Sequence, residues 1–248
     1  TIVAATPCWS ADVSSLLTPT RRRGFEILDD PAVDDVIRKR SLDDVARSNV
    51  VFGGARAVLV ELAGALAQAG TQTLTLLDVG TGIGDIPARA ACEARARGLT
   101  LHAFGIAISV TLLRCARESG VTPVCADALA LPLASKSVDV VICSQLLHHF
   151  ETRDTITVLR ELDRVARARV IVSDLRRSWL AAAGIWLASF PLRFHPVSRH
   201  DGVVSVLRGF TPDELRDLVR TATQQTPVTH RRLGYRTTAS WAPSMEGA

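Results

Sequence analysis

Residues 76–87 read Leu-Leu-Asp-Val-Gly-Thr-Gly-Ile-Gly-Asp-Ile-Pro, an apolar run that leads into a glycine-rich turn and then into a helical pattern. Gly80, Gly82 and Gly84 permit positive φ angles and let a ligand approach the backbone closely. The helix start that follows offers free N–H groups to a polar ligand. The stretch therefore predicts a nucleotide-binding turn between a strand and a helix.

Two other interpretations of this turn stay open. It is compatible with a tight strand-to-helix connection that binds nothing, although three alternating glycines are more than such a connection needs. A dinucleotide site begins with the same G-x-G, but its third glycine would fall at position 85, which is Asp85. The spacing therefore argues against NAD or FAD.

The chain around the turn has the pattern of βαβ units, in which short apolar runs alternate with amphipathic segments. We expect strands at 74–79, 101–106, 121–126, 138–143 and 169–173, and helices near 85–97, 109–119 and 152–165. Beyond these, residues 179–192 read as a buried or amphipathic helix, 196–202 as a loop, and 227–241 as a closing hairpin. A further helix begins after Thr211, an N-cap residue followed by proline.

These elements predict an α/β fold with a Rossmann-like, mostly parallel seven-stranded sheet, helices on both faces and an N-terminal helical cap. Residues 1–30 look irregular, and residues 31–66 have a helical pattern that breaks at Gly53-Gly54. We expect residues 1–70 to form the arm and cap. Residues 71–248 then form the ligand-binding domain, with a pocket-building insertion near 176–210.

Composition places further limits on the function. The 248 residues fit one large domain, and a net charge of +4 without a basic stripe gives little support for a nucleic-acid partner. The five cysteines (Cys8, Cys92, Cys115, Cys125 and Cys143) lack C-x-x-C spacing, and four of them lie in apolar surroundings typical of a core. They predict reduced thiols, and so a cytoplasmic protein without a disulfide framework or zinc site. The longest apolar run is shorter than a membrane span.

The stretch from Asp78 to Gly84, D-x-G-x-G-x-G, resembles motif I of class I S-adenosylmethionine-dependent methyltransferases. Residues 124–128 resemble the third-strand motif of that family, residues 138–150 its fourth-strand motif, and residues 160–165 the following helix. The resemblance covers roughly residues 70–175. It is closest to the ubiquinone-biosynthesis-type branch, which methylates small molecules.

This resemblance implies S-adenosylmethionine as cofactor and methyl donor. It implies glycine backbone against the methionine and ribose, Asp78 toward the amino-acid end, Asp127 at the adenine amino group and Ala128 at the adenine ring. The donor-binding residues that we expect are Asp78, Gly80, Thr81, Gly82, Gly84, Ala107, Ile108, Asp127, Ala128, Ser144 and Gln145.

Position 107 departs from the family. The second strand usually ends in an acid that holds both ribose hydroxyls, and here that residue is Ala107. Loss of a charge-assisted contact of about 1.5–3 kcal/mol predicts a donor affinity weakened by about tenfold to a hundredfold, unless Ser109 or a cap residue compensates.

Methyl transfer from a sulfonium is a direct displacement, so the enzyme mainly aligns the acceptor and excludes water, and we expect no metal. An oxygen acceptor also benefits from a base. His148 and His149 follow the fourth strand at the carboxyl edge of the sheet, where ligands bind in such folds, and His200 beside Asp201 is another candidate base. Structural packing is the alternative role for each histidine.

The acceptor pocket is less defined by the sequence. Trp186, Phe190 and Phe194 are candidates to line an apolar pocket, and Arg176 and Arg177 are candidates to bind an anionic group, with core packing and a solvated turn as the alternatives. We expect O-methylation of a polyketide- or quinone-like small molecule, with no nucleic acid, no membrane span and a homodimer as a candidate assembly.

Three other functions are alternatives to this expectation. A nucleic-acid methyltransferase would carry an Asn/Asp-Pro-Pro-aromatic motif where this chain has Ser144-Gln145-Leu146-Leu147. A degenerate, non-catalytic nucleoside-binding scaffold is supported by Ala107 alone. An oxidoreductase is the third.

Overall fold

The structure, a computed structural model, describes residues 17–30, 32–67 and 72–244. Its centre is a seven-stranded sheet in the order β3-β2-β1-β4-β5-β7-β6. The strands are β1 Thr73–Val79, β2 Thr100–Ala107, β3 Thr122–Cys125, β4 Val138–Ser144, β5 Ala166–Leu175, β6 Val228–Arg232 and β7 Arg236–Trp241. The first five strands are parallel, and β7 runs antiparallel to both of its neighbours. The predicted Rossmann-like α/β fold is therefore confirmed.

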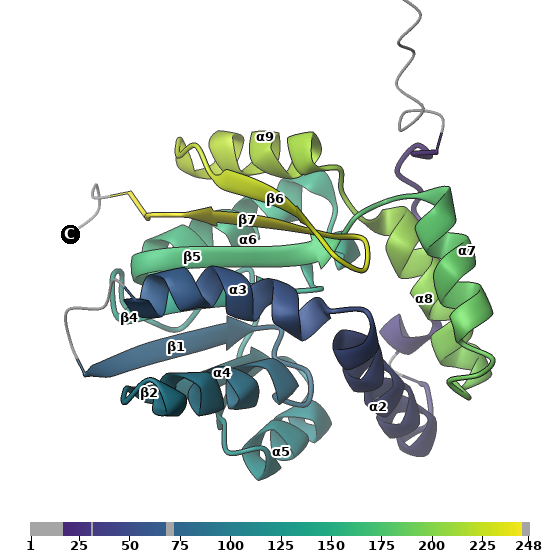
Figure 1. Ribbon diagram of the computed structural model, residues 1–248, viewed down its shortest axis with the longest axis horizontal. Coiled ribbons are helices and arrows are strands. Elements are labelled where there is room, and N and C mark those ends of the chain that lie inside the picture. The colour runs from purple at the N-terminus through teal and green to yellow at the C-terminus, as the bar shows by residue number, and fades with distance from the viewer. Residues whose placement is uncertain (1–16, 31, 68–71, 245–248) are drawn as a thin grey trace, which may run out of the picture.

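Helices cover both faces of this sheet (Figure 1). On one face α3 Gly54–Ala67 and α4 Asp85–Ala96 pack against the central strands. On the other lie α6 Thr152–Val165 and α9 Pro212–Thr223, while α5 Val110–Glu118 packs against β2 and β3. The helix α9 begins with the predicted cap, because the Thr211 hydroxyl accepts from Glu214 N–H and the Glu214 carboxylate accepts from Thr211 N–H.

The core follows from the alternation of side chains along each strand. Leu76, Val140 and Ile142 are buried against α3 and α4. Their neighbours Leu77 and Val141 are buried on the opposite face, against α6 and α9. Both faces of the central strands are apolar, which is why these runs read as continuous hydrophobic stretches.

A second group of helices lies beyond the carboxyl ends of the parallel strands (Figure 1). We call it the cap; it consists of η1 Ile27–Asp29, α2 Asp35–Val51, α7 Trp179–Ala188 and α8 Pro196–Arg208. The helices α2 and α7 both pack toward α8, and α2 meets α3 at the break predicted from Gly53-Gly54, where Gly53 has a φ of +71°. The cap therefore combines residues from the N-terminal region with the insertion after β5.

Two predictions in the insertion are wrong. The expected loop at 196–202 is the first half of α8, since Pro196 stands in the first helical turn, where proline is favoured. Gly202 lies inside that helix, and a Cβ there would approach Cγ1 of Ile185 to 3.3 Å, so the glycine lets α7 and α8 pack closely. The apolar helix ends at Ala188, and its large side chains are exposed where burial was an expectation.

The cysteine prediction also needs correction. Of the four cysteines that the structure describes, Cys143 alone is buried, and Cys92 and Cys125 are exposed. Residues 1–16 of the predicted arm, which include Cys8, lie outside the described residues. Within the described part of the chain, no single helix is long and apolar enough to cross a membrane, although α2 and α3 pass that test together as a pair bent by 58°.

Candidate functional site

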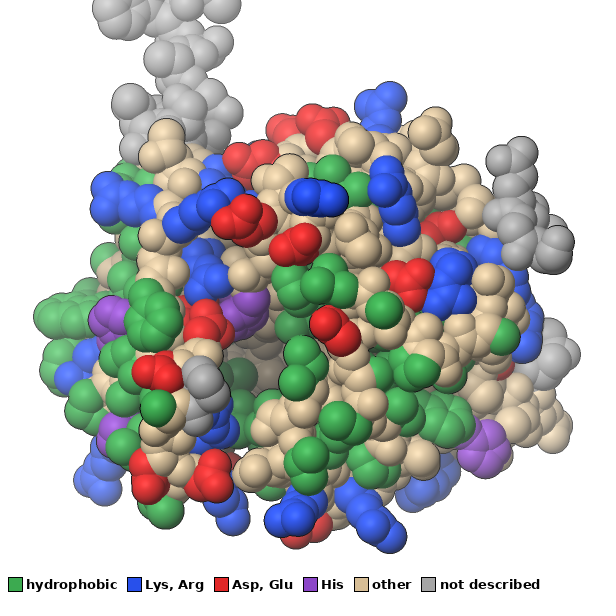
Figure 2. All heavy atoms as spheres, turned by 180° about the vertical axis from the view of Figure 1, so that it is seen from behind, with side chains coloured by type: hydrophobic (Ala, Val, Ile, Leu, Met, Phe, Trp, Pro, Cys, Tyr) green, Lys and Arg blue, Asp and Glu red, His purple; other side chains and the backbone are tan. Residues whose placement is uncertain are grey.

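A cavity of about 1070 Å³ lies between the cap and the carboxyl ends of the central strands. It opens at β1 and β4, where the strand order reverses, which is the position at which open α/β sheets bind ligands. Figure 2 shows the surface hollowed, with acidic and histidine side chains beside the hollow. The predicted donor-binding residues that line the cavity are Asp78, Gly80, Thr81, Gly82, Ala107, Ile108, Asp127, Ala128, Ser144 and Gln145.

The glycine turn presents its backbone to this cavity. Gly82 has a φ of +55°, and a Cβ built on it would meet no described atom within 4 Å, so the turn is open to a ligand there. Gly84 differs from the prediction, because it is not among the described lining residues. Its Cβ would come within 3.1 Å of Cα of Ala116, so this glycine lets the start of α4 pack on α5.

Besides the Thr81 hydroxyl, two polar side chains beside the turn are buried without a hydrogen-bond partner among the described residues. They are the Asp78 carboxylate, through Oδ1, and the Ser144 hydroxyl. Burial raises the pKa of Asp78 to about 7, opposed by the Thr81 hydroxyl and assisted by the charge of Asp85. Buried polar groups without partners are costly, so both atoms are suited to hydrogen-bond a polar ligand such as the amino-acid end of S-adenosylmethionine.

A polar network spans the cavity from the sheet to the cap. The buried Arg236, the first residue of β7, donates from Nη1 to Oε1 of Gln145 at 2.6 Å. The Gln145 amide donates to Asn49 of α2, which donates to Oδ2 of Asp85 at 3.2 Å. Gln145 has a φ of +53°, a left-handed conformation that is uncommon outside glycine and often marks a functional site.

Arg236 carries a charge that its surroundings do not balance. Its Nε atom is buried without a partner among the described residues, and the partner found for its Nη1 atom is the neutral Gln145 amide. Burial lowers the pKa of Arg236 to about 10, against an opposite effect of Asp174. A buried guanidinium of this kind is stabilised by an anionic ligand.

The other end of the cavity lies at β2 and β3. The buried Ala107 side chain lines it at the end of β2, while Ile108 is 70% exposed at its edge. Asp127 is exposed, and its Oδ1 accepts from Leu129 N–H at 2.9 Å. The Ser109 hydroxyl caps α5 by accepting from Leu112 N–H, so it already has a structural role.

His148 lines the cavity where β4 ends. Its Nδ1 lies 2.7 Å from Oδ1 of Asp174, and its backbone N–H donates to the second oxygen of that carboxylate at 3.2 Å. Leu175 N–H also donates to Asp174. Burial opposes the charge of Asp174, but His148 and these hydrogen bonds lower the pKa of the carboxyl. Asp174 is therefore held ionised and fixed in position.

His149 also lines the cavity and is more exposed than His148. Its Nδ1 lies 3.1 Å from Oδ1 of Asp29. Although burial opposes it, Asp29 and the charge of Glu26 raise the pKa of His149. Arg208 completes this cluster, because its Nη1 lies 3.1 Å from Oε1 of Glu26 and 3.0 Å from Oδ2 of Asp29.

Glu26, His148 and His149 each place a potential ligand atom within 4.8 Å of one another, the spacing of a metal site. Arg208 already pairs with the Glu26 carboxylate, which opposes the approach of a second cation. The absence of a metal therefore stays a prediction.

His200 is not among the described residues that line the cavity. Its side chain is half exposed and lies 2.8 Å from Asp201, whose carboxylate accepts from the N–H groups of Ile27 and Leu28. Asp201 thus anchors η1 to α8, and His200 contacts the same carboxylate.

The residues predicted to bind the acceptor also divide into those that line the cavity and those that do not. Phe194 lines the cavity, whereas Trp186 and Phe190 are exposed on the outer side of the cap. Arg177 is buried and pairs with Glu214 at 2.7 Å, and Arg176 stacks on Tyr235; neither arginine is a described lining residue. The apolar lining comes instead from residues such as Leu28, Leu42, Val45, Leu180, Ile185 and Val206.

Several residues of the site were missed by sequence reasoning. Glu26 and Arg236 lie far from motif I in the sequence and carry no motif of their own. Asp174 is a polar residue at the carboxyl end of an apolar strand, so its position was the available signal.

Comparison with known proteins agrees with this geometry. Residues 77–172 match the family model described as a methyltransferase domain, and no curated protein matches the chain. Among solved structures, the chain is similar to magnesium protoporphyrin IX methyltransferase from Synechocystis with bound S-adenosylhomocysteine, at a TM-score of 0.52, 18% identity, and 87% and 90% coverage of the two chains.

A second similar structure is an S-adenosylmethionine-dependent methyltransferase from Thermotoga maritima, with a TM-score of 0.55, 16% identity, and coverage of 84% and 99%. At these identities the likeness shows the fold. The chain therefore shares its fold with structures of S-adenosylmethionine-dependent methyltransferases. The matched domain and this fold support an assignment as an S-adenosylmethionine-dependent methyltransferase.

Proposed function

We propose that the protein transfers the methyl group of S-adenosylmethionine to a hydroxyl of a hydrophobic small molecule, such as a polyketide- or quinone-like phenol. The observation that carries this proposal is a continuous cavity of about 1070 Å³, which joins the glycine turn to the apolar cap and to His148. Its volume is at the upper end of the range for a single small-molecule site, which favours room for both donor and acceptor.

The donor side of the proposal uses the residues at the carboxyl ends of β1 to β4. Gly80, Thr81 and Gly82 would lie against the methionine and ribose, and Ala107 and Ile108 beside the ribose. Asp127 and Ala128 would meet the adenine, while Asp78, Ser144 and Gln145 would face the amino-acid end. Gly84 supports the turn from behind. When bound, S-adenosylmethionine supplies an electrophilic methyl group on its sulfonium.

We assign the general base to His148. When Nδ1 donates to Asp174, a neutral His148 would present the lone pair of Nε2 to the proton of an acceptor hydroxyl. Since the raised pKa of His149 favours its charged form, that residue is better suited to stabilise a developing phenolate than to accept a proton. Apolar cap residues would orient the acceptor and exclude water.

The experiment that tests this function combines binding with turnover. Calorimetry with S-adenosylhomocysteine should show saturable binding, and a panel of alkylated phenols and hydroquinones with labelled S-adenosylmethionine should yield a methyl ether detected by mass spectrometry. Binding without transfer to any hydroxylated member, alongside transfer to an amine or carbon, would replace the O-methylation assignment. Absence of binding would remove the whole proposal.

A further inference from the structure

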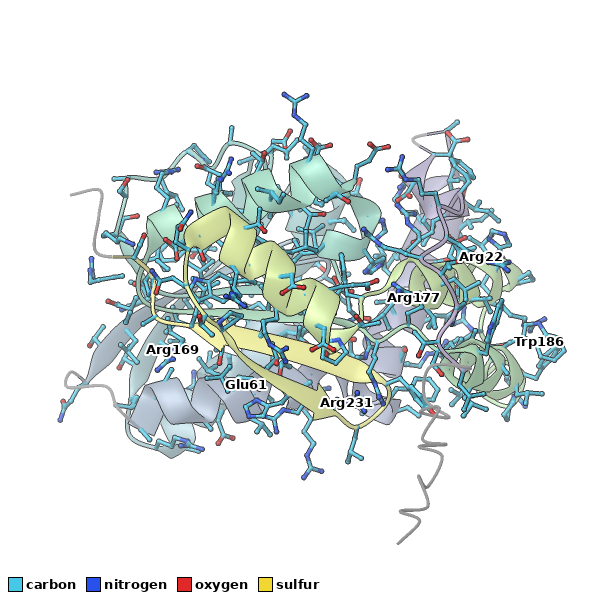
Figure 3. All side chains as sticks on the ribbon, turned by 90° about the horizontal axis from the view of Figure 1, so that it is seen from above. Arg22, Glu61, Arg169, Arg177, Trp186 and Arg231 are labelled. Carbon is cyan, nitrogen blue, oxygen red and sulfur yellow. The ribbon has the colours of Figure 1, made fainter. Side chains whose placement is uncertain are left out.

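The helix α7 has two apolar sides. Ala181, Gly184 and Ile185 line the cavity, and Leu180 both lines it and is 52% exposed at its edge. On the outer side, the large side chains Trp179, Trp186, Leu187 and Phe190 are 41% to 60% exposed. Figure 3 shows Trp186 projecting away from the body of the molecule. We call these four residues the α7 surface.

Arginines surround the α7 surface. Arg22 stacks on Trp179 at 5.0 Å, Arg199 stacks on Phe190 at 3.9 Å, and Arg193 is exposed in the turn that follows α7. Arg40 and Arg47 of α2 reach the same turn, where they donate to the carbonyls of Arg193 and Leu192.

Acidic residues are nearly absent from this region. From Arg176 to His200 the sequence contains neither Asp nor Glu. Arg177 lies in this stretch but is buried against Glu214, and Asp44, which pairs with Arg47, is itself buried. The exposed charged side chains of this stretch are therefore arginines, whereas α2 carries the exposed Asp43 as well as Arg40 and Arg47.

We propose that the α7 surface docks on an anionic lipid bilayer. Tryptophan, phenylalanine and leucine on one face with flanking arginines are the composition of a helix that lies in the membrane interface. The arginines would pair with lipid phosphates while the aromatic rings enter the headgroup region. A second copy of the chain fits this face poorly, because a twofold interface would bring the two sets of flanking arginines together.

This inference goes beyond the proposed methyl transfer, because it names the lipid bilayer as the source of the acceptor molecule. Leu180 belongs to both the cavity and its exposed edge, so the mouth of the cavity lies beside the docking face. An acceptor dissolved in the lipid would reach the site along α7 without crossing water. The inference does not depend on which atom is methylated.

The test measures flotation of the full chain with vesicles, in the absence of donor and acceptor. Vesicles of phosphatidylcholine mixed with phosphatidylglycerol should bind the protein in a salt-sensitive manner, and phosphatidylcholine alone should bind it less. Trp186→Ser combined with Phe190→Ser should weaken binding about tenfold, and Arg193→Gln about fivefold on anionic vesicles. The matched control is Val228→Ser, at a valine that is 56% exposed on β6, and it should bind as the original chain does.

The proposal is overturned if neither vesicle type binds the protein, or if the double variant binds as tightly as the unchanged chain. It is also overturned if the double variant turns a dimer into a monomer in light scattering, since the occupant would then be a second copy. Thermal unfolding of each variant separates lost docking from lost folding. Donor binding measured in parallel distinguishes failure here from failure of the proposed function.

Discussion

The imidazole of His148 and the carboxylate of Asp174 form a buried pair, 3% and 1% exposed, in which Nδ1 lies 2.7 Å from Oδ1. Asp174 follows the Ser144–Ser173 pair along β5, whereas His148 lies in the 3-10 turn Leu147–His149 that follows β4. The sheet register and this turn together set their separation. Because the carboxylate also accepts two backbone N–H groups, the imidazole can turn little.

His148→Gln should lower kcat by about a hundredfold to ten-thousandfold, because it removes the proposed base but keeps a hydrogen-bonding side chain toward Asp174. Affinity for S-adenosylhomocysteine should stay unchanged in calorimetry. His200→Gln is the matched control, as that histidine lies outside the lining, and its kcat should match that of the unchanged enzyme. Equal loss in both variants would contradict the assignment.

Asp78→Asn should stabilise the donor-free protein more at pH 8 than at pH 5. The folded-state pKa of about 7 is raised above the ordinary value, so the folded chain binds the extra proton and stability falls as pH rises between about 4 and 7. The amide carries no charge to bury, and its gain should be about 2–3 kcal/mol larger at pH 8. Denaturant unfolding at the two pH values measures the difference; an equal gain at both would refute the raised pKa.

Arg236→Met should weaken binding of S-adenosylhomocysteine by about tenfold to a hundredfold, because the buried guanidinium lacks an acidic partner among the described residues and the donor carries a carboxylate. The analogue without that carboxylate should bind the original chain and the variant equally. Calorimetry with both compounds makes the comparison. An equal loss for both compounds would mean that Arg236 acts on the shape of the site.

Ala107→Asp should tighten donor binding by about tenfold to a hundredfold, since the side chain at the end of β2 lines the cavity where an acid would reach the ribose hydroxyls. Ala107→Asn serves as the uncharged control and should gain less. Titration with S-adenosylhomocysteine and with its 2′-deoxy analogue checks the effect. Unchanged affinity would show that the ribose is held elsewhere.

Removal of divalent metals should leave methyl transfer unchanged, because Arg208 already pairs with the Glu26 carboxylate of the one candidate metal cluster found among the described residues. Turnover after dialysis against a chelator measures this. If activity were lost and then restored by zinc or manganese, Glu26, His148 and His149 would be assigned as a metal site.

The elements of the sheet could be predicted because each strand and helix carries its signal locally. Apolar runs such as Val138–Cys143, the Thr211 cap and the Gly53-Gly54 break correspond to observed boundaries within a few residues. The structure of the insertion near residues 176–210 was harder to predict from the sequence. Residues 196–202 contain proline and glycine, which favour a loop, but proline at a helix start and glycine at a helix contact fit α8 equally well.

By itself, the sequence determined the turn from Asp78 to Gly84 and the order of strands and helices, because glycine conformations and hydrophobic periodicity act over a few residues. Only the tertiary structure decided that Asp174 holds His148, that Arg236 reaches Gln145, and that His200 lies against Asp201 and outside the cavity lining. Those relationships join segments that are distant in the chain, and they depend on sheet register and cap packing, which no local pattern encodes.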